Sequence, residues 1–279
     1  MMKAFLTCAS LTLLAGSITS AYAQSSDSWT GPYAGVYVGT MLDADNSDAD
    51  SFLFDTNLDG NFGDTVFTAA GANAFSPGSC SGSANGPTPG AGCGSDDTGT
   101  SAGLRAGYDW QMGTWLIGVL GEYERGDMSD TVTSFSTTPA SYTMKRELDD
   151  AWAFRVRTGF IFGAGDSSLL YATGGVIQAG VENSFTTSNT VNTFTANGDD
   201  DVDGTQWGVG YDYRFNDTVT IGVEYLASRL EDDGYRVRAA GPAPATNPFI
   251  RTNAAGTDFR RSDRYVEPES VHVTAGWRF

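Results

Sequence analysis

The last nine residues, 271–279, most constrain what this chain can fold into. Apolar side chains occupy every odd position, while polar or small residues, among them His272 and Arg278, occupy the even ones. A strand sends successive side chains to opposite faces, so one face would be apolar and the other polar. A chain that ends on such a strand, with Trp277 and Phe279 on the apolar face, is typical of a transmembrane β-barrel, which closes by pairing its last strand with its first.

The N-terminus has the pattern of an export signal. Lys3 precedes an apolar stretch from Phe5 to Ile18, and Ala21-Tyr22-Ala23 offers a small-residue cleavage site. The apolar stretch is too short and too often interrupted for a membrane-spanning helix. We therefore expect residues 1–23 to be a cleaved signal peptide and residues 24–279 to form a barrel in the outer membrane.

The composition excludes some functions and permits a barrel. The formal charge is -18, and loss of Lys3 with the signal would make it -19. Nucleic acid is not an expected partner, because its phosphates need a basic patch. A hydrophobic fraction of 40% resembles a soluble protein, but barrel strands expose only every second residue to lipid. The expected partners are outer-membrane lipid, lipopolysaccharide and the barrel-assembly machinery.

Eight segments of the chain alternate as the last one does. They lie at about residues 31–40, 100–110, 115–124, 152–162, 169–180, 207–215, 219–225 and 271–279. In the segment Leu169 to Gly180 both faces are so apolar that the sequence does not show which one points outward. Short turns near Gly113, Gly163 and Asn216 join some of these segments, and long polar stretches join the others.

The connections alternate between short and long. The long ones cover about residues 41–98, 125–145, 182–203 and 231–263, and the first has no sustained period. So long a loop would count against a compact soluble domain, whereas a barrel with both termini in the periplasm has short inner turns and long outer loops. The sequence therefore predicts an all-β, eight-stranded antiparallel up-and-down barrel with long extracellular loops. A soluble lipocalin-like barrel with the faces reversed is the alternative.

The polar faces of these strands carry as many cations as acids. The cations are Arg105, Arg155, Arg157, Arg214 and Arg278, and the acids are Asp109, Glu122, Glu124, Asp212 and Glu224. A barrel of eight strands is just wide enough to be filled by side chains, and buried charges are costly unless they pair. We therefore expect a plugged, salt-bridged lumen. A narrow channel, the alternative function, would need an imbalance of charge or small residues along one side.

Five short motifs follow one another along the predicted strands. They lie at residues 29–35, 106–108, 169–175, 224–225 and 276–279. In this order they resemble the small outer-membrane barrels of alphaproteobacteria, the porin-family or opacity-like proteins. The resemblance spans the whole barrel and implies eight strands, surface loops and no agreed enzymatic activity. The long first loop departs from the commonest members of that family.

His272, the single histidine of the chain, is the candidate base for catalysis. A lipid-modifying barrel enzyme, the second alternative, would place histidine and serine on the outer face at the membrane rim. The alternation places His272 on the lumen face instead. We therefore interpret it as an interior histidine and expect no enzymatic activity.

The first long loop contains the spacing of a metal site. Acids or amides at alternate positions precede a glycine, as at the start of a calcium loop of the EF-hand type. The candidate ligands are Asp55, Asn57, Asp59, Asn61 and Asp64. Val66 stands where a bidentate acid is expected, although Asp96 or Asp97 could substitute for it. A weaker echo lies at residues 199–204, and simply solvated acidic loops are the alternative.

Cys80 and Cys93 remain after the signal peptide takes Cys8. Export places them in a compartment that permits oxidation, and a bond between them would order a segment rich in glycine and proline. We expect a disulfide, with free thiols as the alternative.

The whole pattern predicts an integral outer-membrane protein of structural or surface-interaction type. We interpret Trp277 and Phe279 as an assembly signal and a membrane-interface anchor. The acidic loops could hold Ca2+ or a surface ligand that the sequence does not identify.

Overall fold

The computed structural model describes residues 29–43, 50–96, 98–198 and 201–279. Its helices in these ranges are two 3-10 turns of three residues each, η1 (Pro89–Ala91) and η2 (Ala164–Asp166), and neither could cross a membrane. The predicted signal peptide, Asp97 and the start of the motif at residues 199–204 lie outside the described residues.

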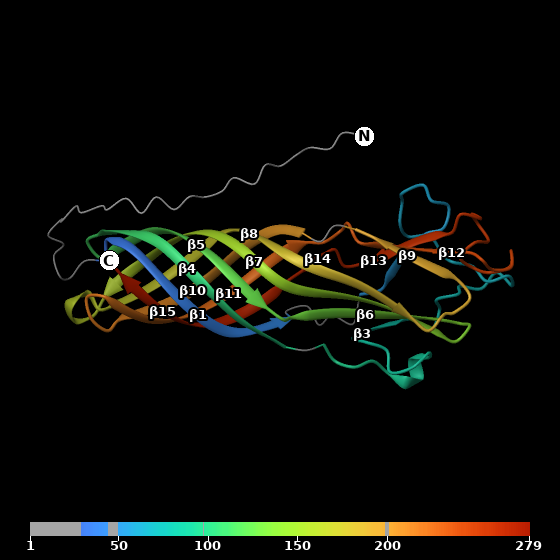
Figure 1. Ribbon diagram of the computed structural model, residues 1–279, viewed down its shortest axis with the longest axis horizontal. Helices are drawn as coiled ribbons and strands as arrows, with labels where there is room; N and C mark the ends of the chain where they lie inside the picture. Colours follow the sequence, from blue (N-terminus) through green and yellow to red (C-terminus); the bar gives the residue numbers. More distant parts are fainter. Residues whose placement is uncertain (1–28, 44–49, 97, 199–200) are drawn as a thin grey trace.

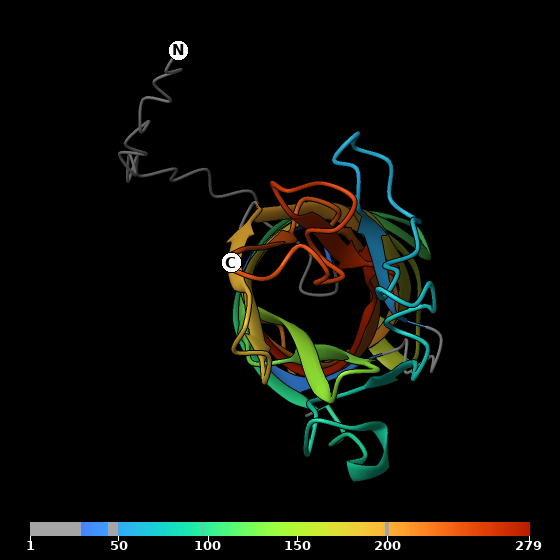
Figure 2. The same cartoon turned by 90° about the vertical axis from the view of Figure 1, so that its right-hand side faces the viewer.

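Among the described residues, eight antiparallel strands close a barrel, and Figures 1 and 2 show its closed shape. They are β1 (Gly31–Asp43), β4 (Gly99–Met112), β5 (Trp115–Gly126), β7 (Ala140–Phe162), β8 (Ser168–Thr187), β10 (Asp201–Arg214), β11 (Val219–Glu231) and β15 (Pro268–Arg278). Strand β15 pairs with β1, with Tyr33 opposite Arg278 and Val38 opposite Val273. The predicted closure of the barrel by its last strand is confirmed.

The outer wall of the barrel is apolar. Val38, on this wall, is 61% exposed, whereas its neighbour Tyr37 points inward and is buried. Aromatic side chains bound the wall at both ends, as at a membrane interface. On β5 these are Trp115 and Tyr123, eight positions apart, which corresponds to roughly 27 Å along a strand. Strand tilt of about 40° reduces that to a height of roughly 20 Å, close to the apolar band of outer-membrane barrels.

The structure decides the orientation of β8, which the sequence left open. Leu170 and Val176 point outward, while Leu169, Tyr171 and Ile177 point inward. Both faces are apolar because the inward residues belong to two apolar layers inside the barrel. Leu169 and Tyr171 lie in a layer near the short turns, and Ile177 lies in another near the long connections.

The long connections contain strands that the sequence analysis did not predict. Strands β7 and β8 run on beyond the apolar wall, β6 (Ser129–Ser136) pairs with β7, and β3 (Ser79–Ser81) pairs with β6. A second sheet has the order β2 (Phe52–Asp55), β13 (Thr257–Arg261), β12 (Arg236–Ala240) and β9 (Thr193–Asn197). The short β14 (Tyr265–Val266) pairs with β11. Figure 1 shows that these strands, here called the extension, continue the long axis of the barrel.

An aromatic core holds the extension together. Its rings are Phe52, Phe54, Phe75, Tyr142, Phe185, Phe194, Phe249 and Phe259, and their contacting centroids lie 4.5 to 6.5 Å apart. These residues come from all four long connections, so each connection is ordered by the others. Burial of large aromatic rings between two sheets supplies the stabilisation that the short strands lack by themselves.

Candidate functional site

The interior of the barrel is layered along its axis. Apolar residues around Leu116 and Leu169 lie near the short turns. The paired charges of the lumen come next. A second apolar layer follows at the level where the wall meets the extension: Met41, Met128, Leu148, Ile177, Ala179, Val181, Val202, Leu230 and Val266. Charged and apolar layers thus alternate along the axis of the barrel interior.

Arg157 on β7 organises the first charged group. It donates to Asp109 at 2.9 and 2.5 Å and to Asp212 at 3.0 Å. Its guanidinium also lies 4.6 Å from the ring centroid of Tyr33 and 5.1 Å from that of Tyr171. Charge-assisted hydrogen bonds and aromatic faces together compensate the desolvation of this buried cation.

Two arginines and two glutamates form the second charged group. Arg105 donates to Glu122 at 2.8 Å and also contacts Glu224. Arg155 donates to Glu224 at 3.2 Å and also contacts Glu122. Each charged group therefore has two neighbours of opposite charge. Their attraction offsets the cost of removing these ions from water.

The two remaining cations lie near the short-turn end. Arg278 donates to Asp109 at 2.9 Å and to the carbonyl of Trp29. Arg214 donates to the carbonyl of Gly165 at 2.6 Å and lies 5.7 Å from the centroid of Trp29. Among the described residues no carboxylate pairs with Arg214. Trp29 and Tyr33, the aromatic residues that flank Arg278, were not predicted as lumen residues. The alternating pattern of the first strand could have indicated Tyr33, whereas Trp29 lies before that strand.

His272 is fully buried, and its Nε2 lies 3.1 Å from the Oγ of Ser101 and 3.4 Å from a carboxylate oxygen of Glu124. Its ring stacks on Tyr37, with 4.5 Å between the centroids. In a hydrolytic triad the acid holds the imidazole nitrogen opposite the one that faces the serine. Here both partners contact one nitrogen, so the group lacks triad geometry. The sequence alone could not indicate Ser101. Ser101 and His272 lie on the two strands that flank β1, and both are paired with Gly39, so only the strand register brings them together.

Of the residues of the calcium motif, Asn57, Asp59 and Asn61 are exposed, Asp64 is half-buried and Asp55 is buried. A carboxylate of Asp55 accepts hydrogen bonds from the backbone N–H groups of Leu58 and Gly60 at 2.7 and 2.8 Å. Asp64 accepts from the backbone and the hydroxyl of Thr56. In the described part of the chain no three His, Cys, Asp or Glu side chains form a metal-binding group. A calcium site involving Asp59 and its neighbours stays a prediction.

A buried ionic cluster ties the long connections of the extension to one another. Arg261 donates to Asp50 and Asp130, both at 2.8 Å, and Arg146 donates to Asp130 at 3.1 Å. Burial raises the pKa of Asp130, but Arg146 and Arg261 outweigh it and hold that pKa below its ordinary value. Burial raises the pKa of nearby Asp232, and Arg146 offsets this only in part. Asp50, Arg261 and the hairpin of β6 and β7 come from three different connections, which the cluster ties together.

The expected disulfide between Cys80 and Cys93 is present. It closes a small hairpin in which Gly94 donates to the carbonyl of Ser83 at 2.8 Å. Figure 2 shows this segment projecting sideways from the extension.

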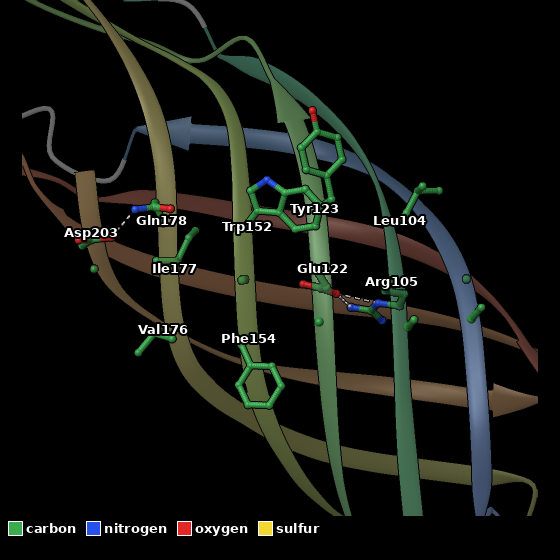
Figure 3. Close-up of a pocket in the computed structure, with 16 residues that line it drawn as sticks. Leu104, Arg105, Glu122, Tyr123, Trp152, Phe154, Val176, Ile177, Gln178 and Asp203 are labelled. Atoms are coloured by element: carbon green, nitrogen blue, oxygen red, sulfur yellow. Dashed lines mark hydrogen bonds and ion pairs between the residues drawn. The ribbon is translucent and has the colours of Figure 1, made fainter. Parts of the chain in front are cut away.

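A hollow of about 970 Å³ lies in the wall of the barrel. Figure 3 shows Leu104, Tyr123, Trp152, Phe154 and Val176 around it, on four neighbouring strands. The hollow arises because the register places small outward residues side by side, with Ala106 opposite both Ala34 and Gly121. The side chains around the hollow point away from the lumen. The hollow is therefore a depression in the apolar outer surface of the barrel.

Comparison with known proteins decides the family. The outer membrane protein beta-barrel domain family matches residues 11–279. The chain belongs to this family. It is therefore an outer-membrane protein, and its long connections and extension are expected on the outside of the cell.

Relatives of this outer-membrane barrel are known in sequence and in structure. The 31 kDa outer-membrane immunogenic proteins of Brucella melitensis biotype 1 and Brucella suis biovar 1 are each 27% identical to it over 128 residues, 46% of this chain and 52% of theirs. The chain thus spans about half the length of the curated relatives it matches. The crystal structure of OprG from Pseudomonas aeruginosa superposes with a TM-score of 0.50 at 14% identity, covering 90% of this chain and 96% of that one. At this identity the likeness shows the fold alone.

Proposed function

We propose that this protein is a closed membrane anchor without enzymatic activity, which holds a folded β-structured extension above the outer membrane for structural or surface-interacting purposes. The observation that carries the proposal is the set of buried ion pairs in the lumen. In that lumen Arg105, Arg155 and Arg157 are buried and each is bound to two carboxylates.

The paired charges of the lumen argue against passage of solutes. A solute would have to separate the pairs made by Arg155 and Arg157, and it would then meet the apolar layer around Leu148 and Leu230. Separating a buried pair without replacing its partner costs about 3–5 kcal/mol. A water-filled channel of the large-porin kind needs a wider barrel with a polar, open interior.

The extension supports a surface role. Its aromatic core and its ionic cluster make it a rigid body above the apolar wall, and the hairpin closed by Cys80 and Cys93 projects from it. Surface-exposed irregular segments on a rigid scaffold are where binding sites commonly lie. The outer wall would contact lipid and lipopolysaccharide, and the acidic loops would contact cations or a surface ligand.

Conductance across a planar lipid bilayer tests the proposal. The refolded full chain should show no stable conductance of large-porin size, with or without calcium. Heat-modifiable migration of the same preparation on gels verifies that the barrel is folded, and a general porin in the same bilayer verifies insertion. Stable steps of conductance from the folded protein would contradict the proposal and favour the alternative function, a channel.

A further inference from the structure

Glu124 differs from the other acids that face the lumen. Asp109, Glu122, Asp212 and Glu224 each contact at least one arginine, whereas the ion-pair partner described for Glu124 is His272. A carboxylate removed from water is costly unless a positive charge or several donors compensate it. The lumen therefore holds one acid, Glu124, that forms no ion pair with an arginine among the described residues.

A small cavity adjoins Glu124 inside the barrel. Its volume is about 20 Å³, which is room for a single species of the size of water. Its other polar lining comes from Gln206 on β10, Ser228 on β11, Ser270 on β15, and Asp149 and Asp150 beside the bulge of β7. Apolar side chains, including Met41, Leu148 and Leu230, line the rest of the cavity.

The side chain of Gln206 gives independent evidence for a ligand in this cavity. Its side chain is buried, with 7% exposed, and its amide nitrogen donates to the Oγ of Ser228 at 3.0 Å. Its amide oxygen has no hydrogen-bond partner among the described residues. Leaving a buried acceptor unpaired costs about 1–3 kcal/mol, so a bound species that satisfies this oxygen is favoured.

We infer that this cavity binds one dehydrated monovalent cation, of which sodium is the test case, between the carboxylate of Glu124 and the amide oxygen of Gln206. The atoms available to bind a cation are carboxylate, amide and hydroxyl oxygens, the ligands that hard cations prefer. The nearby carboxylates of Asp149 and Asp150 add negative potential. A divalent ion that keeps its water would not fit a space for one water-sized species.

Thermal unfolding of the refolded full chain in lipid nanodiscs tests this site. The unfolding midpoint is measured at mildly alkaline pH in sodium chloride and in N-methylglucamine chloride of equal ionic strength, so that general screening cancels. The midpoint should rise with sodium concentration in a saturable way, because a ligand that binds only the folded state stabilises it. Glu124→Gln and Gln206→Leu should each abolish the difference between the two salts. Gln178→Leu, the same kind of change on the outer face of β8, should retain it.

Three results would overturn the inference. Equal midpoints in the two salts would mean that a water molecule fills the cavity. A sodium effect that persists in both Glu124→Gln and Gln206→Leu would place the ion elsewhere, and if Glu124→Gln does not refold, Gln206→Leu alone decides. Stabilisation by calcium but not by sodium, lost in Glu124→Gln, would replace the monovalent ion with a divalent one.

Discussion

Replacing Arg157 with methionine should destabilise the barrel far more than the loss of an exposed ion pair. Arg157 is 2% exposed and holds both Asp109 and Asp212. Without it, Asp109 keeps Arg278 at 2.9 Å, but Asp212 has no other ion-pair partner among the described residues. Methionine preserves much of the side-chain volume, so the change mainly removes charge.

The expected loss of unfolding free energy follows from Asp212, which stays buried without an ion-pair partner. Removing one partner of a buried pair costs about 3–5 kcal/mol, because the other charge stays buried without compensation. At about 1.4 kcal/mol for each tenfold change, this is a roughly hundredfold to several-thousandfold shift of the unfolding equilibrium. The double substitution Arg157→Met with Asp212→Asn should recover part of the loss, because it removes that charge.

Arg229 provides a matched control on the outside of the protein. It pairs with Glu267 at 3.1 Å, but its side chain is 57% exposed. An exposed pair of this kind contributes about 0–1 kcal/mol, so Arg229→Met should change stability little. The assay is urea unfolding of each variant in lipid vesicles, followed by tryptophan fluorescence. If Arg157→Met costs no more than Arg229→Met, or if the double variant is no more stable than Arg157→Met, the account of the lumen given above is wrong.

Three further changes test the extension. Phe259→Ala should cost it about 3–5 kcal/mol by opening a cavity in the aromatic core, and hydrogen exchange should rise in the extension while the barrel strands stay protected. The pKa of Asp130 lies below its ordinary value of 3.8, so its stabilisation is complete above that pH and is lost as the pH falls through the lower folded-state pKa; exchange rates measured across this range should rise less in Asp130→Asn than in the wild type. Calorimetry at millimolar calcium should show binding heat that Asp59→Asn removes, and no heat from the wild type would eliminate the predicted calcium loop.

The barrel could be predicted because each of its strands separates two environments. Trp207 and Val209 on β10 face outward, and Gln206 and Asp212 face inward, so the period of two is written into each segment without knowledge of its neighbours. The same local pattern placed the lumen charges on one face. It could not show that Glu124 would lie apart from the arginines, because that depends on the register between strands.

The extension could not be predicted from local patterns. Phe54, Phe194 and Phe259 lie in three separate connections that read as polar loops, and each becomes buried only against the others. The partners of His272 were hidden for the same reason, since Ser101 reaches it across β1.

By itself the sequence determined the number of barrel strands, the closure by residues 271–279, and which face of most strands is apolar, because contact with lipid on one side imposes a pattern on every strand. The tertiary structure alone decided the orientation of β8, the folding of the long connections, and the pairing of individual charges. These depend on which layers and strands meet inside the barrel, and residues far apart in the chain decide that together.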